Sequence, residues 1–176
     1  MSGPVKVVRM GELAVSATPE DELVSMGLGS CVGVALVDRE RAVAGLAHVM
    51  LPTANAAYSA PAKFADRAVP TLLACIERLG ATRERMIAVL AGGAQMFTGV
   101  KEGVAGLDLG ARNEAAVRGA LAELGIPVRA AATGGDRGRT VRVRVGEARV
   151  SVKEAGGVEV SLWHPHVHAD DLVEAP

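Results

Sequence analysis

The sequence predicts a single α/β domain, spanning residues 1–176, in which mixed β-sheets pack with two main helices. Three observations predict this class. At 176 residues with 49% apolar types, the chain has the length of one domain and enough apolar side chains for its own core. Short apolar runs between turn residues are typical of strands. Two longer segments repeat apolar residues every three or four positions, which is typical of helices.

The N-terminal part is expected to be mainly β-structure. Short strands are predicted over Val5–Val8 and Glu12–Ser16, followed by a turn through 18–21 and a glycine-rich stretch at 27–30. Two apolar runs, Cys31–Val37 and Ala42–Met50, then flank the charged turn 38–41. Two such runs joined by a short loop predict a β-hairpin.

Two helices are expected further along the chain. The apolar positions that define the first are Phe64, Ala68, Leu72, Ile76 and Leu79. This helix is expected to end at Gly80, and Pro70 inside it implies a kink. The second is expected to start at Asn113 as its N-cap and to end at Gly125. Further strands are predicted over Met86–Ala91, Val128–Ala132, Thr140–Val145, Ala148–Lys153 and Val158–Leu162, which gives eight to ten in all.

Composition excludes several classes of function. The formal net charge is −1 and aromatic residues make up 2% of the chain, so neither a nucleic-acid binder nor a stacking platform is expected. The longest apolar runs fall far short of the roughly 18 residues of a membrane-spanning helix. No secretory signal precedes Cys31 and Cys75, so reduced thiols in a cytoplasmic protein are expected.

The predicted hairpin brings a thiol and an imidazole together. If Val37 faces Ala42 across the turn, counting back along both strands places Cys31 opposite His48. Facing residues of antiparallel strands have Cβ atoms about 4.5 to 5.5 Å apart and point to the same side. His48 could then take the thiol proton and hold a thiolate at neutral pH, as an activated nucleophile requires. A bulge in either strand would shift the register and separate the two side chains.

Other candidate features are expected to be structural. Cys75 lies in the helical apolar pattern and is interpreted as packing. Three histidines alternate at His164, His166 and His168, but no carboxylate or cysteine cluster accompanies them. They are interpreted as a solvated, flexible tail from about residue 164, and no metal is expected. The glycine-rich stretch fails the dinucleotide fingerprint because a strand follows where a helix is needed, so no cofactor is expected.

Several ordered motifs resemble the CheD family of chemoreceptor glutamine deamidases. They are Gly27-Leu28-Gly29-Ser30-Cys31-Val32, Gly45-Leu46-Ala47-His48-Val49-Met50-Leu51-Pro52, Lys63-Phe64-Ala65-Asp66, Gly92-Gly93-Ala94-Gln95-Met96-Phe97, Gly110-Ala111-Arg112-Asn113, Thr133-Gly134-Gly135 and Gly138-Arg139. Together they cover most of the chain. The resemblance implies a four-layer α/β/β/α sandwich related to bacterial toxin deamidases.

The resemblance also implies a catalytic site. It gives Cys31 as the nucleophile and His48 as the base, and it places a third catalytic residue six positions before the cysteine, where the family has threonine and this chain has Ser25. Backbone N–H groups around Ser30, including that of Gly29, are the nearest candidate oxyanion donors. The residues expected at the substrate approach are Gly27, Gln95 and Phe97.

The implied activity is deamidation of glutamines in the cytoplasmic helices of a methyl-accepting chemotaxis receptor. A CheC-type phosphatase is the second implied partner. Two alternatives stay open from the residues themselves. One is a non-catalytic adaptor that binds receptor or phosphatase and keeps Cys31 as packing, and the other is a thiol hydrolase of a different amide.

Overall fold

The computed structural model describes residues 3–55, 60–96 and 108–165. Its helices are α1 (Ala65–Glu77) and α2 (Leu109–Glu123), and two short 3₁₀ turns precede α1 and β6. Its strands are β1 (Val5–Val7), β2 (Leu13–Ser16), β3 (Glu22–Leu28), β4 (Val32–Asp38), β5 (Ala44–Val49), β6 (Met86–Gly92), β7 (Val128–Thr133), β8 (Arg139–Arg144), β9 (Arg149–Glu154) and β10 (Glu159–Trp163). The mixed α/β class predicted from the sequence is confirmed.

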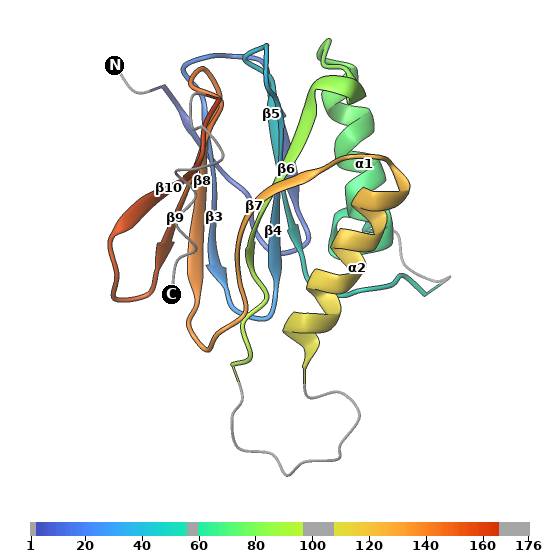
Figure 1. The fold of residues 1–176 in the computed structure, drawn as a ribbon, viewed down its shortest axis with the longest axis vertical. Coiled ribbons are helices and arrows are strands. Elements are labelled where there is room, and N and C mark those ends of the chain that lie inside the picture. Colours follow the sequence, from blue (N-terminus) through green and yellow to red (C-terminus); the bar gives the residue numbers. More distant parts are fainter. Residues whose placement is uncertain (1–2, 56–59, 97–107, 166–176) are drawn as a thin grey trace.

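The strands form two five-stranded sheets, which Figure 1 shows side by side. The first sheet has the order β1-β3-β8-β9-β10, and the second has the order β2-β5-β4-β6-β7. Both sheets are mixed, because β1 pairs in parallel with β3 and β6 pairs in parallel with β7, whereas the other pairs are antiparallel.

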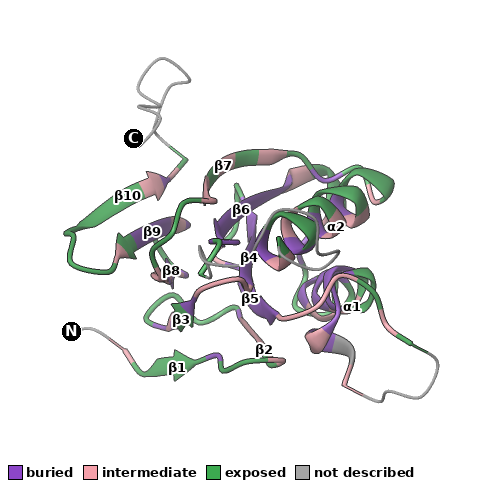
Figure 2. Ribbon diagram, turned by 90° about the horizontal axis from the view of Figure 1, so that it is seen from below, coloured by how far each residue is buried: buried purple, intermediate pink, exposed green. Residues whose placement is uncertain are grey.

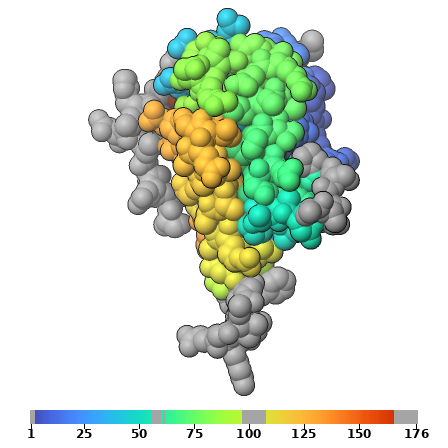
Figure 3. All heavy atoms as spheres, turned by 90° about the vertical axis from the view of Figure 1, so that its right-hand side faces the viewer, coloured from blue at the N-terminus to red at the C-terminus, as the bar shows by residue number. Residues whose placement is uncertain are grey.

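Two apolar cores separate three layers. One core lies between the sheets, and the other lies between the second sheet and the two helices. Figure 3 shows α1 in green and α2 in yellow side by side on one face of the molecule, and Figure 2 shows their buried sides turned toward the strands. Helix α1 buries Ala65, Ala68, Val69, Leu72, Leu73 and Ile76 in this way. The fourth, helical layer that the resemblance implied is not among the described residues.

The outer face of the first sheet carries a group of ion pairs. Arg142 and Arg144 on β8 each pair with Glu22 on the neighbouring β3 and with Glu159 on β10, two strands away. Charged side chains that are already paired keep this face compatible with water. Val5 and Val7, on β1 of the same sheet, are exposed apolar residues.

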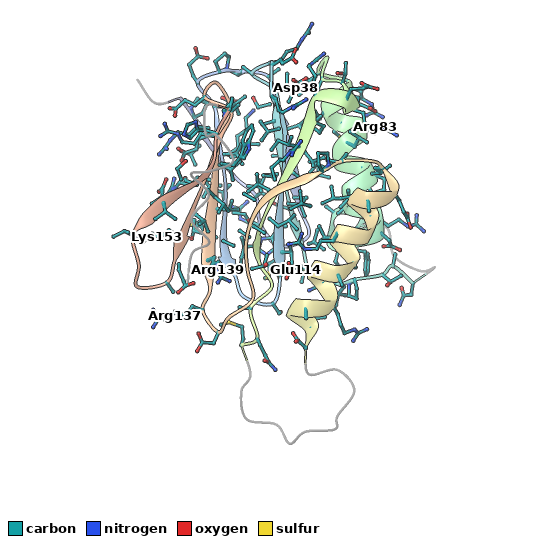
Figure 4. All side chains as sticks on the ribbon, in the orientation of Figure 1. Asp38, Arg83, Glu114, Arg137, Arg139 and Lys153 are labelled. Atoms are coloured by element: carbon teal, nitrogen blue, oxygen red, sulfur yellow. The ribbon has the colours of Figure 1, made fainter. Side chains whose placement is uncertain are left out.

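The hairpin of β4 and β5 has a wider turn than the sequence predicted. Val37 pairs with Ala44 rather than Ala42, and His48 pairs with Gly33 rather than Cys31. The cause is Asp38, a fully buried carboxylate that binds the guanidinium of Arg85 through three hydrogen bonds of 2.8–3.1 Å. This pair keeps Asp38 in the strand, at the end of the molecule where Figure 4 shows it. The turn therefore closes between Asp38 N–H and the carbonyl of Val43.

Two further sequence expectations were wrong. Strand β3 was missed, because its bulge between Ser25 and Leu28 breaks the alternation of apolar and polar residues. Helix α2 begins at Leu109, capped by the Asp108 carboxylate, which accepts from the N–H of Ala111 at 2.9 Å. Asn113 is therefore inside the helix and is not its cap. Within the described ranges, neither helix is long and apolar enough to cross a membrane.

Candidate active site

The candidate site lies between the two sheets, at the end where β3 leads into β4. Cys31 directly precedes β4 and packs against the inter-sheet core. His48, on β5, is 1% exposed, and Ser25, on β3, is fully buried. The structure thus brings Ser25 from one sheet to His48 on the other, while Cys31 stands at the mouth of the same inter-sheet space.

The orientation of the His48 ring follows from one hydroxyl group. Ser25 Oγ lies 2.9 Å from the carbonyl oxygen of Val8 and 2.8 Å from His48 Nδ1. Because a carbonyl only accepts, Ser25 donates its one proton to Val8, and Nδ1–H donates to Ser25 Oγ. The imidazole therefore carries its proton on Nδ1. Nε2 is left as the basic nitrogen, and it has no hydrogen-bond partner among the described residues.

Cys31 and His48 lie diagonally across the hairpin. Continuing the register beyond Val32 and Val49 places Cys31 level with Met50, two residues from His48. The shift of two positions keeps both side chains on the same side of the sheet, because side chains alternate with a period of two. Diagonal neighbours are about 7–8 Å apart, a distance that aromatic and long side chains still reach across. The predicted face is correct, and the predicted directly facing pair is wrong.

Burial sets the protonation of this pair at rest. Burial raises the pKa of the Cys31 thiol, although its own backbone N–H opposes the rise. Burial also lowers the pKa of His48, against smaller upward effects of Val8 and Glu12. Both shifts favour the neutral thiol and neutral imidazole. The thiolate held at neutral pH by an imidazolium stays a prediction, and both directions count against it.

The glycine-rich approach to Cys31 has a defined backbone. Gly27 has a φ of +69° with open space where a Cβ would lie, so the bulge and not a close neighbour requires glycine there. A Cβ at Gly29 would come within 3.0 Å of the Met96 side chain. The N–H of Gly29 already donates to the carbonyl of Gly27 at 3.0 Å. The N–H groups of Ser30 and Cys31 are therefore the remaining candidate oxyanion donors.

A hollow of about 350 Å³ opens beside this segment. Its lining residues are Gly93, Gln95, Asp108, Ala111, Glu114, Gly134, Gly135 and Asp136. Gln95, expected at the substrate approach, is exposed, and its N–H donates to Gly135 at 2.8 Å. Figure 4 shows Glu114 and Arg139 at this side of the molecule. Phe97 lies outside the described residues.

The remaining sulfur and imidazole groups lie elsewhere. Cys75 is in α1, on the outer side of the second sheet, whereas Cys31 packs toward the inter-sheet core. His164 follows β10, and His166 and His168 lie outside the described residues. In the part of the chain that the structure describes, no three His, Cys, Asp or Glu residues are grouped as metal ligands.

One buried polar residue near the site was misinterpreted from the sequence. Asn113 is fully buried, and its Nδ2 donates to the carbonyls of Ser30 and Met50, both at 2.9 Å. The only sequence signal for such a role was its place in the motif Gly110-Ala111-Arg112-Asn113. An asparagine in a helix interior costs helix propensity, and that cost indicates a tertiary contact.

Comparison with known proteins places this geometry in a family. Residues 50–154 match the family model described as CheD chemotactic sensory transduction. A probable chemoreceptor glutamine deamidase CheD of Desulforamulus reducens is 41% identical over 151 residues, covering 85% of this chain and 90% of the relative. The chemoreceptor glutamine deamidase CheD of Thermotoga maritima is 41% identical over 154 residues, covering 88% and 94%. An Archaeoglobus fulgidus relative of the same description, termed probable, is 43% identical over 141 residues, covering 80% and 87%. The chain belongs to the CheD family.

Proposed function

We propose that this protein deamidates glutamine side chains of chemoreceptors, with Cys31 as the nucleophile and His48 as the base. The observation that carries the proposal is the His48 ring, held through Nδ1 by Ser25 with its basic Nε2 unpartnered and on the same side of the sheet as Cys31. Relatives named as chemoreceptor glutamine deamidases over most of the chain support it.

The first half-reaction releases ammonia. A glutamine amide is a poor electrophile, so a covalent intermediate divides its hydrolysis into two easier steps. His48 Nε2 takes the Cys31 thiol proton as Sγ adds to the amide carbon. The imidazolium then gives that proton to the amide nitrogen, the C–N bond breaks, and ammonia leaves. The products are a thioester on Cys31 and a neutral His48.

The second half-reaction restores the thiol. Neutral His48 takes a proton from water as the oxygen adds to the thioester carbon. The imidazolium returns the proton to the Cys31 sulfur as the C–S bond breaks, and a glutamate side chain is released. Ser25 keeps Nδ1 protonated through both halves, so that Nε2 alone exchanges protons.

The neutral resting pair suits this sequence of steps. A thiol that stays protonated until a substrate arrives is protected from alkylation and oxidation, since the thiolate is the reactive form. The base still acts at neutral pH, because burial keeps His48 unprotonated there. Proton transfer then accompanies the attack of sulfur on the amide carbon.

The proposed substrate is the helical cytoplasmic part of a methyl-accepting chemotaxis receptor, so the enzyme would work in the cytoplasm. Gly27, Gln95 and Phe97 are proposed to line the approach of that helix. The CheC-type phosphatase partner stays a prediction from the resemblance.

A substrate comparison tests this proposal against its alternatives. Ammonia release is measured with a receptor cytoplasmic fragment, with an unrelated helical protein rich in glutamine, and with free glutamine. Release from the receptor fragment alone supports the proposal. Equal release from the other two would indicate a general amide hydrolase, and no release from any would favour the adaptor.

A further inference from the structure

Helix α2 reaches the catalytic segment through one side chain. Its buried residues are Gly110, Asn113, Val117 and Leu121, which form the face turned to the second sheet. At its first turn the helix packs backbone against backbone, since a Cβ on Gly110 would lie only 2.4 Å from the carbonyl oxygen of Gly93. This close approach brings Asn113 up to the end of the β4–β5 hairpin.

Asn113 bridges the two strands where their own pairing stops. The last pair of the β4–β5 ladder is Val32 with Val49. Just beyond it, the Nδ2 group of Asn113 donates one hydrogen to Ser30 and the other to Met50, each at 2.9 Å. A primary amide nitrogen has two hydrogens, so both are used. Where the next pair of the ladder would be, the side chain thus links Ser30, which precedes Cys31, to Met50, which lies two residues after His48.

Neighbouring contacts hold the same segment by its backbone. The carbonyl of Cys31 accepts from Gly93 N–H at 2.8 Å, and the carbonyl of Gly29 accepts from Ala94 N–H at 2.8 Å. Asn113 is the one described side chain that ties the Cys31 segment directly to the His48 strand. Its Oδ1 is buried without a partner among the described residues. The amide is therefore fixed by its two donated bonds alone.

We infer that Asn113 is a positioning residue that sets the separation of Cys31 and His48, and this inference rests on the proposed function of that pair. Its two hydrogen bonds go to backbone carbonyls and not to the side chain of Cys31 or His48, and it belongs to the buried face of α2. A movement of the Ser30–Cys31 backbone relative to Met50 changes the distance between Cys31 and His48. A misplacement of about 1 Å costs on the order of 10²-fold in rate.

The test compares three variants. Asn113→Ala removes both donors, and Asn113→Asp keeps the shape while even a protonated carboxyl can donate only one of the two bonds. The matched control is Val117→Ala, one turn further along the same face and fully buried, which loosens the packing of α2 without touching Ser30 or Met50. We measure kcat and KM on a receptor cytoplasmic fragment, thermal unfolding, and the pH dependence of Cys31 alkylation by iodoacetamide in a Cys75→Ser background.

If Asn113 positions Cys31, its variants should lower both kcat and the alkylation midpoint of Cys31. In both Asn113 variants kcat is expected to fall by about 10- to 100-fold with KM within about twofold, as a 1 Å displacement implies. The freed loop exposes Cys31, so its alkylation midpoint moves down toward the ordinary thiol value of about 8.5. The Val117→Ala control is expected to lose thermal stability with both readouts unchanged per folded molecule.

Different results would refute the positioning role and the proposed function. If the Asn113 variants lose only stability, as the control does, the positioning role is refuted. If wild-type protein converts no receptor glutamine, the proposed function fails, and the alkylation midpoints still decide whether Asn113 positions Cys31. Unchanged midpoints in folded Asn113 variants would overturn the inference in that case as well.

Discussion

Ser25 Oγ lies 2.8 Å from Nδ1 of His48, and the two residues belong to different sheets. This hydrogen bond links the two layers at the place where the chemistry is proposed. It also decides which ring nitrogen is the base, because the second contact of Ser25, to the carbonyl of Val8, uses its only proton. Packing of the two sheets and the protonation state of the base are therefore coupled.

Removing the Ser25 hydroxyl should slow the reaction moderately. A neutral hydrogen bond contributes about 0.5 to 1.5 kcal/mol, so Ser25→Ala should reduce kcat by roughly 2- to 13-fold, and more if the imidazolium needs the bond. Ser25→Thr keeps the hydroxyl on a stiffer side chain and should keep or slightly raise activity. Steady-state kinetics beside thermal unfolding checks this. A change in melting temperature alone for Ser25→Ala would mean that the hydroxyl orients nothing.

Loss of the imidazole should be nearly as damaging as loss of the thiol. His48→Ala removes the group that handles the proton in both half-reactions, which is worth about 10²- to 10⁴-fold. Members of one catalytic unit are strongly non-additive, so His48→Ala in a Cys31→Ala background should cause little further loss. The measurement is ammonia release by the single and double variants. Full activity in His48→Ala would remove the base from the mechanism.

pH-dependent measurements should show the pKa of His48 below its ordinary value and the pKa of Cys31 above its ordinary value. Burial lowers the pKa of His48, so kcat/KM should rise with pH through a value below the ordinary 6.5. Burial raises the pKa of Cys31, so its alkylation midpoint should lie above the ordinary thiol value. Kinetics and iodoacetamide labelling between pH 5 and pH 10 in a Cys75→Ser background check both. A thiol midpoint well below about 8.5 would instead show a thiolate held by an imidazolium.

The buried pair at the far end of the hairpin should control acid stability. Burial alone would raise the pKa of Asp38, but hydrogen bonds from Arg85 and from the Glu40 backbone outweigh it and hold the pKa below its ordinary 3.8. A carboxylate with a lowered folded pKa stabilises the protein above its unfolded pKa, and that stabilisation is lost as pH falls through the folded value.

Unfolding by urea at several pH values measures this effect. Asp38→Asn should lower the free energy of unfolding at pH 7 by about 1.5–3 kcal/mol, because it removes charge-assisted hydrogen bonds to Arg85, which is partly exposed and keeps Glu40 4.0 Å away. It should also flatten the decline of stability below pH 4. If the variant and wild type decline in parallel, Asp38 is not the group responsible.

Local patterns were sufficient for most elements of the fold. The apolar runs that became β4, β5 and β6 and the three- and four-residue spacing in α1 are properties of neighbouring residues, so the sequence predicts them. Asp38 shows the limit of prediction from neighbouring residues. It looks like part of a charged turn, but Arg85, 47 positions away, draws it into the core. The hairpin register depends on that distant contact, and the predicted pairing of Cys31 with His48 was displaced by two residues.

The sequence predicted which side chains would react, but it did not predict which contacts hold them in place. Cys31 and His48 are recognisable because thiol and imidazole groups are rare and the two belong to the apolar runs of one predicted hairpin. Asn113 is not recognisable, because its partners are backbone carbonyls 83 and 63 positions away, which no residue pattern records. The protonation of the pair also depends on burial. The predicted hairpin register suggested an ion pair of Cys31 and His48, whereas burial of the two groups favours their neutral forms.

The most direct test is the intact mass of a receptor cytoplasmic fragment incubated with wild-type protein, with Cys31→Ala and with Cys75→Ser, followed by peptide mapping. We expect the wild type and Cys75→Ser to convert particular glutamines to glutamates, seen as the mass change from amide to acid, and the folded Cys31→Ala protein to leave the fragment unchanged. Conversion of the same glutamines by Cys31→Ala at a comparable rate would contradict covalent catalysis by this thiol.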